Sequence, residues 1–175
     1  MWLTLKNLLF TVLVPGTIAV LIPRALRPGS AEIELEGWRW VGLPLSTAGA
    51  AIFFWCLWHF ARTGRGTPAP IDPPKVLVVR GLYRHTRNPM YVGVGLVLLG
   101  EAALYASGVL LAYALGVLTA FHGFVLLYEE PTLRRKFGPA YDDYRRAVPR
   151  WLPQLPRRPR AQLTAKNTKD AKNKL

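Results

Sequence analysis

The chain has 175 residues, 51% of them hydrophobic, and its 23 Lys and Arg residues against 10 Asp and Glu residues give a formal net charge of +13. Nucleic-acid-binding proteins also carry such a charge, but no recognition motif accompanies it here. Thirteen of the basic residues lie from Arg134 onward, directly after the last apolar run, where a membrane-surface patch would lie. We therefore expect no nucleic-acid partner. The single cysteine, Cys56, excludes an intrachain disulfide and a thiolate metal cluster, and we expect no metal site.

Four long apolar runs divide the chain. A helix needs roughly 20 apolar residues to cross a hydrocarbon core, and a run of that length with almost no charge is a candidate span. We predict membrane-spanning helices over four ranges: residues 2–22, 38–60, 89–105 and 109–128. Pro15 predicts a kink in the first span. The short turn at residues 106–108 makes the last two spans a helical hairpin.

The distribution of basic residues predicts the orientation of these spans. Six Lys and Arg residues lie between the second and third runs and thirteen follow the fourth run, whereas the turn between the third and fourth runs has none. Basic loops remain on the cytoplasmic side of a membrane. We therefore expect both termini in the cytoplasm and the chain in the inner membrane of a bacterium.

The part after the fourth span is polar. Residues 129–147 have a helical pattern interrupted by Gly138 and Pro139, which predicts two short helices at the membrane surface. Residues 1–152 are therefore expected to form a single membrane domain. Residues 153–175 have too few apolar side chains to fold, so we predict a disordered basic tail that is attracted to anionic lipid headgroups.

Two polar segments hold the residues that could bind a ligand or take part in a reaction. The first segment precedes the third span. Pro89 is placed at the start of this span, where proline is well tolerated. Arg87 and Asn88 therefore lie at the positive end of a helix, which favours an anionic group.

The second polar segment begins with Glu129 and Glu130, at the negative end of the fourth helix. Two carboxylates are unfavourable there unless a cation or a hydroxyl donor is bound. A basic and amide-rich cluster beside an acidic pair suits a ligand with separated charges. S-adenosylmethionine, with its sulfonium, ammonium, carboxylate and ribose hydroxyls, is such a ligand.

Both segments resemble the signature of the membrane methyltransferases that include isoprenylcysteine carboxyl methyltransferase and phosphatidylethanolamine N-methyltransferase. The first family motif is Gly-x-Tyr-x-x-x-Arg-His-Pro-x-Tyr-x-Gly, and its positions hold Gly81, Tyr83, Arg87, Asn88, Pro89, Tyr91 and Gly93. The second is Glu-Glu-x-x-Leu-x-x-x-Phe-Gly-x-x-Tyr-x-x-Tyr, and its positions hold Glu129, Glu130, Leu133, Phe137, Gly138, Tyr141 and Tyr144. Two separate motifs in the same order, with a hairpin between them, make this resemblance specific.

The resemblance implies an all-α integral membrane fold of about four transmembrane helices, in which a cytoplasmic C-terminal helical cap completes a pocket for S-adenosylmethionine. It implies that the cofactor is bound by Val76, Leu77, Val78, Tyr83, Arg87, Asn88, Pro89, Met90, Tyr91, Glu129 and Glu130. Three positions depart from the family pattern: Lys75 and Asn88, where histidine is usual, and Val125. Carboxyl-methylating relatives have an arginine at the position of Val125, so this departure disfavours an isoprenylcysteine carboxylate acceptor.

His122 is a candidate because ionisable residues inside membrane spans usually have a function. It lies seven residues before Glu129, so the two side chains project from nearly the same helix face, separated by roughly 10 Å along the axis. The alternative is a neutral histidine that a neighbouring helix satisfies. Arg87, Glu129 and His122 are our candidate catalytic residues, and an ammonium acceptor would need one of the acids or His122 as a base.

These observations predict transfer of a methyl group from S-adenosylmethionine to a lipid or isoprenoid acceptor that enters from the bilayer. The acceptor group is either an isoprenylcysteine-type carboxylate or a phospholipid amine. Two alternatives remain open. One is a non-catalytic membrane scaffold that binds no cofactor, and the other is a sterol-reductase-like enzyme that uses NADPH, against which the small size argues.

Overall fold

A computed structural model describes residues 13–26, 37–63, 77 and 79–154. Within these ranges all regular elements are helical, as the all-α prediction requires. Residues 2–12 of the first predicted span and residues 155–175 of the predicted tail lie outside the described residues. The helices in chain order are η1 (Thr17–Leu21), α2 (Ile22–Leu26), η3 (Trp38–Val41), α3 (Gly42–Thr63), η4 (Gly81–Arg84), α4 (Pro89–Leu104), α5 (Gly108–Phe124), η5 (Val125–Glu129), α6 (Glu130–Phe137) and α7 (Pro139–Ala147).

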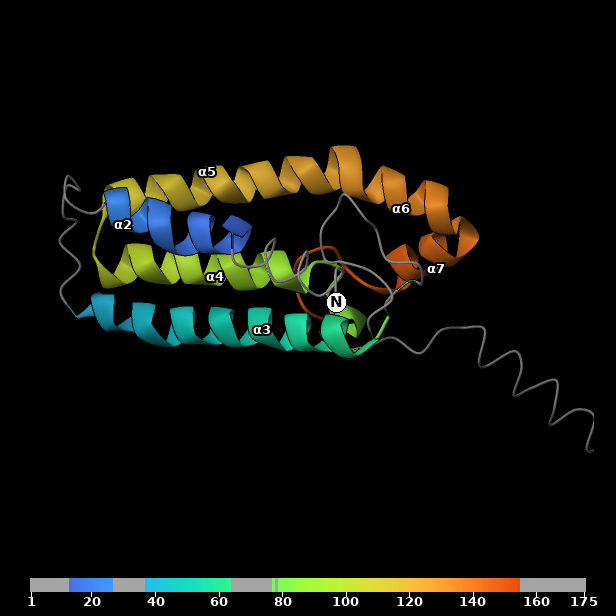
Figure 1. The fold of residues 1–175 in the computed structure, drawn as a ribbon, viewed down its shortest axis with the longest axis horizontal. Coiled ribbons are helices and arrows are strands. Elements are labelled where there is room, and N and C mark those ends of the chain that lie inside the picture. The colour runs from blue at the N-terminus through green and yellow to red at the C-terminus, as the bar shows by residue number, and fades with distance from the viewer. Residues whose placement is uncertain (1–12, 27–36, 64–76, 78, 155–175) are drawn as a thin grey trace, which may run out of the picture.

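The long helices form an elongated bundle (Figure 1). α3 and α4 pack side by side along their lengths, α4 packs against α5, and the segment of η1 and α2 lies against both α4 and α5. A small apolar core lies between these helices, where Leu98 and Ala114 are fully buried. This segment also joins α5 through a hydrogen bond of 2.9 Å from the Tyr113 hydroxyl to the Ile18 carbonyl.

Glycines allow α3 and α4 to approach closely. A Cβ added to Gly49 would lie 2.5 Å from the backbone oxygen of Gly93, and a Cβ on Gly93 would lie 2.8 Å from the oxygen of Gly49. Gly42 and Gly100 meet in the same way one heptad away along the antiparallel pair. The two backbones are therefore in contact, and a side chain at these positions would separate the helices.

The turn between α4 and α5 lies where the sequence predicts it. Ala106 adopts a left-handed conformation with φ of 48°, and the chain reverses at this point. The buried Ser107 then caps α5, because its Oγ accepts a hydrogen bond of 3.1 Å from the Leu110 amide. A serine N-cap satisfies one of the otherwise unpaired amides at a helix start.

The end of α5 is not regular. The helix widens into the π-helical turn η5, in which the Glu130 amide donates to the Val125 carbonyl five residues earlier. Pro131 follows directly and has no N–H to donate to a carbonyl of this turn, which explains why the hydrogen-bond pattern shifts here. α6 then ends at Gly138, whose φ of +53° reverses the chain into α7.

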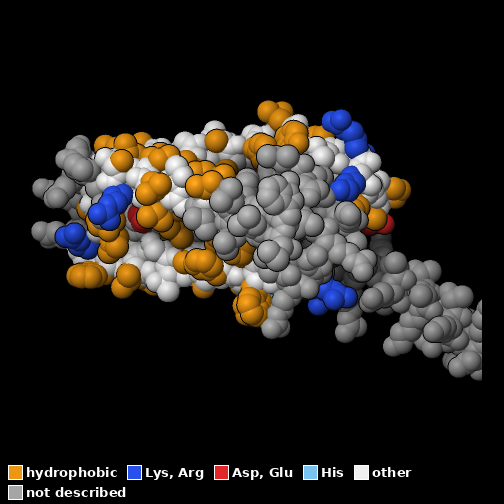
Figure 2. Space-filling view, in the orientation of Figure 1, with side chains coloured by type: hydrophobic (Ala, Val, Ile, Leu, Met, Phe, Trp, Pro, Cys, Tyr) orange, Lys and Arg blue, Asp and Glu red, His pale blue; other side chains and the backbone are white. Residues whose placement is uncertain are grey.

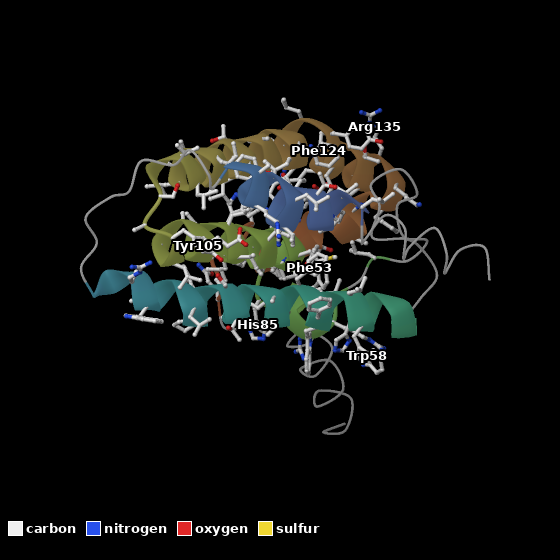
Figure 3. The ribbon with its side chains drawn as sticks, turned by 60° about the vertical axis from the view of Figure 1, so that its left-hand side comes forward. Phe53, Trp58, His85, Tyr105, Phe124 and Arg135 are labelled. Atoms are coloured by element: carbon white, nitrogen blue, oxygen red, sulfur yellow. The ribbon has the colours of Figure 1, made fainter. Side chains whose placement is uncertain are left out.

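The outer surface of the bundle is apolar along its length. On the face shown in Figure 2, hydrophobic side chains are spread over the bundle around the grey area, and Lys and Arg side chains lie toward its two ends. Large hydrophobic residues are exposed, with Phe54 at 64% and Leu127 at 83%. In Figure 3, Trp58 points away from the bundle at the end of α3, and Arg135 projects outward from α6. An exposed apolar area of this extent is unfavourable in water.

Two described helices are long and apolar enough to cross a membrane, Arg39–His59 and Gly108–Phe137. Two further apolar helices, Leu13–Leu26 and Pro89–Leu104, are shorter. α3, with 22 residues, is about 33 Å long, which matches a hydrocarbon core of about 30 Å.

Gly49→Ala tests the backbone contact between α3 and α4. We expect a loss of stability of about 1–3 kcal/mol, because the new methyl group meets backbone atoms that cannot rotate away. Gly116→Ala is the control: no atom lies within 4 Å of its added Cβ, so the change is neutral or stabilises α5 by up to about 1 kcal/mol. Thermal unfolding in detergent measures both, and equal melting temperatures for the two variants would contradict the close packing.

Candidate functional site

Both family-like motifs meet at the end of the bundle where α4 begins and α5 ends (Figure 1). α7 folds back under α6 and places Tyr141, Tyr144 and Val148 in a buried cluster. Leu77, just before the first motif, packs against this cluster. The aromatic positions of the second motif therefore hold the polar segment before α4 against the C-terminal helices.

Three charged side chains form the centre of the site. Arg87 Nη1 donates to Glu130 Oε1 at 2.8 Å. Arg150 binds the same carboxylate with two nitrogens, from Nε to Oε1 at 2.6 Å and from Nη2 to Oε2 at 3.1 Å. The side chains of Arg87 and Glu130 are each only 9% exposed. The hydrogen bond to Glu130 is the main reason that the pKa of Arg150 lies above its ordinary value.

Arg87 has a buried donor that its described contacts leave unused. Its Nη1 lies 3.5 Å from the Tyr141 hydroxyl, but its buried Nε–H has no hydrogen-bond partner among the described residues. A buried donor without an acceptor costs about 1–3 kcal/mol, so native proteins rarely leave one. Arg87 can therefore offer this N–H to an anionic or carbonyl group of a ligand.

A second bridge joins α4 to the π-helical turn. The Tyr91 hydroxyl donates to Glu129 Oε2 at 3.0 Å, one helical turn beyond Arg87. The ring of Tyr91 packs at 4.8 Å against the ring of Phe121 on α5. Glu129 and Glu130 therefore have different surroundings, because Glu129 meets a phenol and aromatic rings whereas Glu130 meets two arginines.

The turn η4 is held in place by a hydrogen bond from α7. Gly81 begins η4 with φ of +58°, a conformation that favours glycine. The Tyr144 hydroxyl donates to the Tyr83 carbonyl at 2.7 Å. Burial raises the pKa of Tyr144 above its ordinary value, so the phenol stays protonated and keeps this donor. Tyr83 thus occupies a fixed position beside the first motif.

Residues 148–154, which we call the strap, run back along the loop before α4. The Arg87 amide donates to the Pro149 carbonyl at 2.9 Å, and the Gln154 amide donates to the His85 carbonyl at 3.0 Å. Thr86 Oγ1 and Asn88 Nδ2 both donate to the Arg150 carbonyl, at 3.0 and 3.2 Å. The strap is therefore paired with the first motif over almost its whole length.

His122 lies on the exposed side of α5. Its Nδ1 accepts a hydrogen bond of 3.1 Å from the indole Nε1–H of Trp151 in the strap, and the two rings lie 5.8 Å apart. An imidazole nitrogen accepts only when it carries no proton, so this bond requires neutral His122 with its proton on Nε2. Among the described residues, His122 is therefore bound to Trp151 of the strap.

The predicted site residues fall into three groups. Arg87, Tyr91, Glu129 and Glu130 are brought together in the two bridges, whereas Val76 and Val78 lie outside the described residues. The remaining predicted residues are buried or half-buried in the same segment before and at the start of α4: Leu77, Tyr83, Asn88, Pro89 and Met90.

Two of the predicted cofactor-binding residues bind each other. Arg87 and Glu130 are in direct contact, because the arginine compensates the buried carboxylate. Because Glu130 is already bound by two arginines, Glu129 is the acid of the pair that could bind a ligand. Thr86 and Arg150 were not predicted from the sequence, although the Val-Pro-Arg-Trp stretch that begins four residues after the second motif was a signal. Among the described residues no cluster of acids, histidines or cysteine is placed to hold a metal ion.

Comparison with known proteins agrees with the motifs. Residues 38–140 match the family model described as phospholipid methyltransferase. This match covers more than half of the chain, which therefore belongs to the phospholipid methyltransferase family. The predicted relationship to this group of membrane methyltransferases is thus confirmed.

Two curated relatives are similar over shorter stretches. A protein-S-isoprenylcysteine O-methyltransferase of Schizosaccharomyces pombe is 35% identical over 81 residues, which are 46% of this chain and 34% of the relative. Methanethiol S-methyltransferase 2 of Bradyrhizobium diazoefficiens is 38% identical over 74 residues, which are 42% of this chain and 27% of the relative. The matched stretch thus covers about a third of each relative's length or less. No solved structure matches the chain.

Glu130→Gln tests the ion triad. The change leaves two arginines without their counter-charge, and breaking a buried pair costs about 3–5 kcal/mol of stability. The matched control is Asp143→Asn, which breaks the exposed pair of Asp143 and Arg146 and should leave the melting temperature unchanged. A melting temperature for Glu130→Gln equal to that of the parent would show that the triad does not hold the site together.

Proposed function

We propose that this protein transfers a methyl group from S-adenosylmethionine to a lipid-like acceptor embedded in a membrane. The observation that carries the proposal is the buried, unsatisfied Nε–H of Arg87, which lies just before α4 and pairs with Glu130 through its Nη1. Family membership and the names of both relatives support methyl transfer. They give no support to a sterol-reductase-like enzyme. The scaffold alternative differs from the proposal in that a scaffold would bind no cofactor.

The residues fit a cofactor with separated charges. The Arg87 Nε–H and the positive end of the α4 dipole favour a carboxylate. Glu129, held by Tyr91, suits an ammonium group or ribose hydroxyls, and Leu77, Tyr83, Asn88, Pro89 and Met90 complete the surface. S-adenosylmethionine supplies a methyl group on a sulfonium, which a nucleophile can displace. The protein then mainly has to hold donor and acceptor in line and exclude water.

The acceptor we propose is a phospholipid amine rather than a carboxylate. Val125, where carboxyl-methylating relatives have an arginine, is fully buried in η5. The two arginines nearest the site already share Glu130. An ammonium must lose a proton before it can attack, and we propose Glu129 as the base that receives it. His122 is less suited to this task, because its free lone pair accepts from Trp151.

The membrane arrangement follows from the apolar exterior. We propose four spans at residues 2–22, 38–60, 89–105 and 109–128 in one membrane domain of residues 1–152, with both termini in the cytoplasm of a bacterium. α6, α7 and the strap would form the cytoplasmic cap over the cofactor. The acceptor would enter from the bilayer, and the basic tail that follows the strap would contact anionic lipid headgroups.

Two variants test the cofactor site. Glu129→Gln removes the negative charge that would face the ligand but leaves the Glu130 triad intact. Arg87→Lys keeps a cation near Glu130 but removes the Nε–H. Losing a hydrogen bond to a charged group costs about 1.5–3 kcal/mol, or roughly ten- to a hundredfold in affinity. Titration of the purified proteins with S-adenosylhomocysteine should show this loss in both variants.

Arg146→Ala is the control, because its guanidinium is exposed and pairs with Asp143 on the outside of α7. It should bind as the parent does. Melting temperatures exclude unfolding as the cause of any loss. Parent-like affinity in folded Glu129→Gln and Arg87→Lys would place the cofactor elsewhere and favour the scaffold.

A further inference from the structure

We propose that His122 and Trp151 are positioning residues, a clasp that holds the strap in the place where it aligns Arg150, Glu130 and Asn88 for cofactor binding. This inference rests on the proposed function, and it gives His122 a role other than that of a base. Neither residue needs to touch the cofactor or the acceptor in this role.

The strap connects three parts of the site. Its backbone pairs with the loop before α4 at both ends, through Pro149 and Gln154. Its Arg150 guanidinium binds Glu130 at the start of α6 with two hydrogen bonds. Its Trp151 reaches α5 at His122. A segment with these three attachments fixes the distance between the start of α4 and the end of α5.

The clasp lies next to Arg150, the strap residue that binds Glu130. Trp151 directly follows Arg150, whose side chain holds Glu130 and whose carbonyl receives both Thr86 and Asn88. A shift of Trp151 therefore moves the guanidinium and this carbonyl together. Because Arg87 shares Glu130 with Arg150, the shift also changes the surroundings of the unsatisfied Arg87 Nε–H.

The contact between His122 and Trp151 is not required by the apolar core. His122 is exposed, and it lies two turns before Glu129 on a helix that already packs against α4. The bond joins residues 29 positions apart, across the π-helical turn, α6 and α7. It therefore closes the C-terminal cap as a ring, and its loss should loosen the strap while the bundle stays folded.

Three substitutions separate the hydrogen bond from the shape of the residues. His122→Ala removes the acceptor, and Trp151→Phe removes the donor but keeps an aromatic ring. His122→Asn restores an acceptor oxygen at a position similar to that of Nδ1. We expect His122→Ala and Trp151→Phe to weaken S-adenosylhomocysteine binding about three- to tenfold, the effect of one hydrogen bond. His122→Asn should bind within about twofold of the parent, and the double variant should lose no more than either single one.

Hydrogen exchange gives an independent measure of the strap without any cofactor. In His122→Ala the amides of Arg87 and Gln154, which join the strap to the loop before α4, should exchange faster, while the melting temperature stays within the range of the parent. His122→Asn should restore their protection. A purely structural histidine would instead lower the melting temperature with no selective change at these amides.

The two measurements distinguish failure of the clasp from failure of the proposed function. If the parent binds no S-adenosylhomocysteine, the proposed function is wrong, and the exchange experiment still decides whether the clasp exists. If the parent binds but folded His122→Ala and Trp151→Phe bind equally well, with unchanged exchange at Arg87 and Gln154, the clasp is refuted.

Discussion

A carboxylate removed from water must be compensated by opposite charge and by hydrogen bonds, and Glu130 receives both from Arg87 and Arg150. These three residues come from the loop before α4, the start of α6 and the strap. Their mutual attraction brings together segments that are far apart in the sequence. The triad satisfies Glu130, whereas the neighbouring Glu129 binds the Tyr91 hydroxyl and the buried Arg87 Nε–H has no partner among the described residues. The candidate cofactor site therefore consists of Glu129 and the Arg87 Nε–H, beside the Glu130 triad.

Much of the fold could be predicted because local signals mark its boundaries. Pro89 starts α4, Ser107 starts α5 and Gly138 separates α6 from α7, and each acts through a backbone requirement that the sequence shows directly. The close contact of α3 and α4 also has a signal, in the glycines of the two helices, although their spacing alone does not reveal that Gly49 faces Gly93. The number of spans and their orientation stay predictions from the apolar runs and basic residues.

The site was harder to predict, for a physical reason. The motifs indicated which residues take part, but the pairing of Glu130 with Arg87 and of Glu129 with Tyr91 depends on the π-helical turn that changes the direction of successive side chains. Pro131 was a signal for that turn. The roles of Arg150 and His122 depend on a strap that returns over the first motif, and side-chain contacts between residues 20 to 62 positions apart have no local pattern.

The two curated relatives are named for methyl transfer to different acceptors, one an isoprenylcysteine and the other methanethiol. The family match over residues 38–140 includes the first motif and the acidic pair Glu129 and Glu130. Selection of the acceptor would then lie in the apolar helices and at positions such as Val125, buried in the turn beside the acids. The proposed preference for an amine follows from this turn, because it offers a carboxylate and aromatic rings but no further arginine.

Lipid mass spectrometry after expression with methionine labelled in its methyl group tests the central claim most directly. Membranes from cells that contain the parent should accumulate a phospholipid with a labelled methyl group on its amine, and cells with Glu129→Gln should lack it at equal protein levels. Identical labelled-lipid profiles for the parent, the variant and cells without the protein would contradict the account.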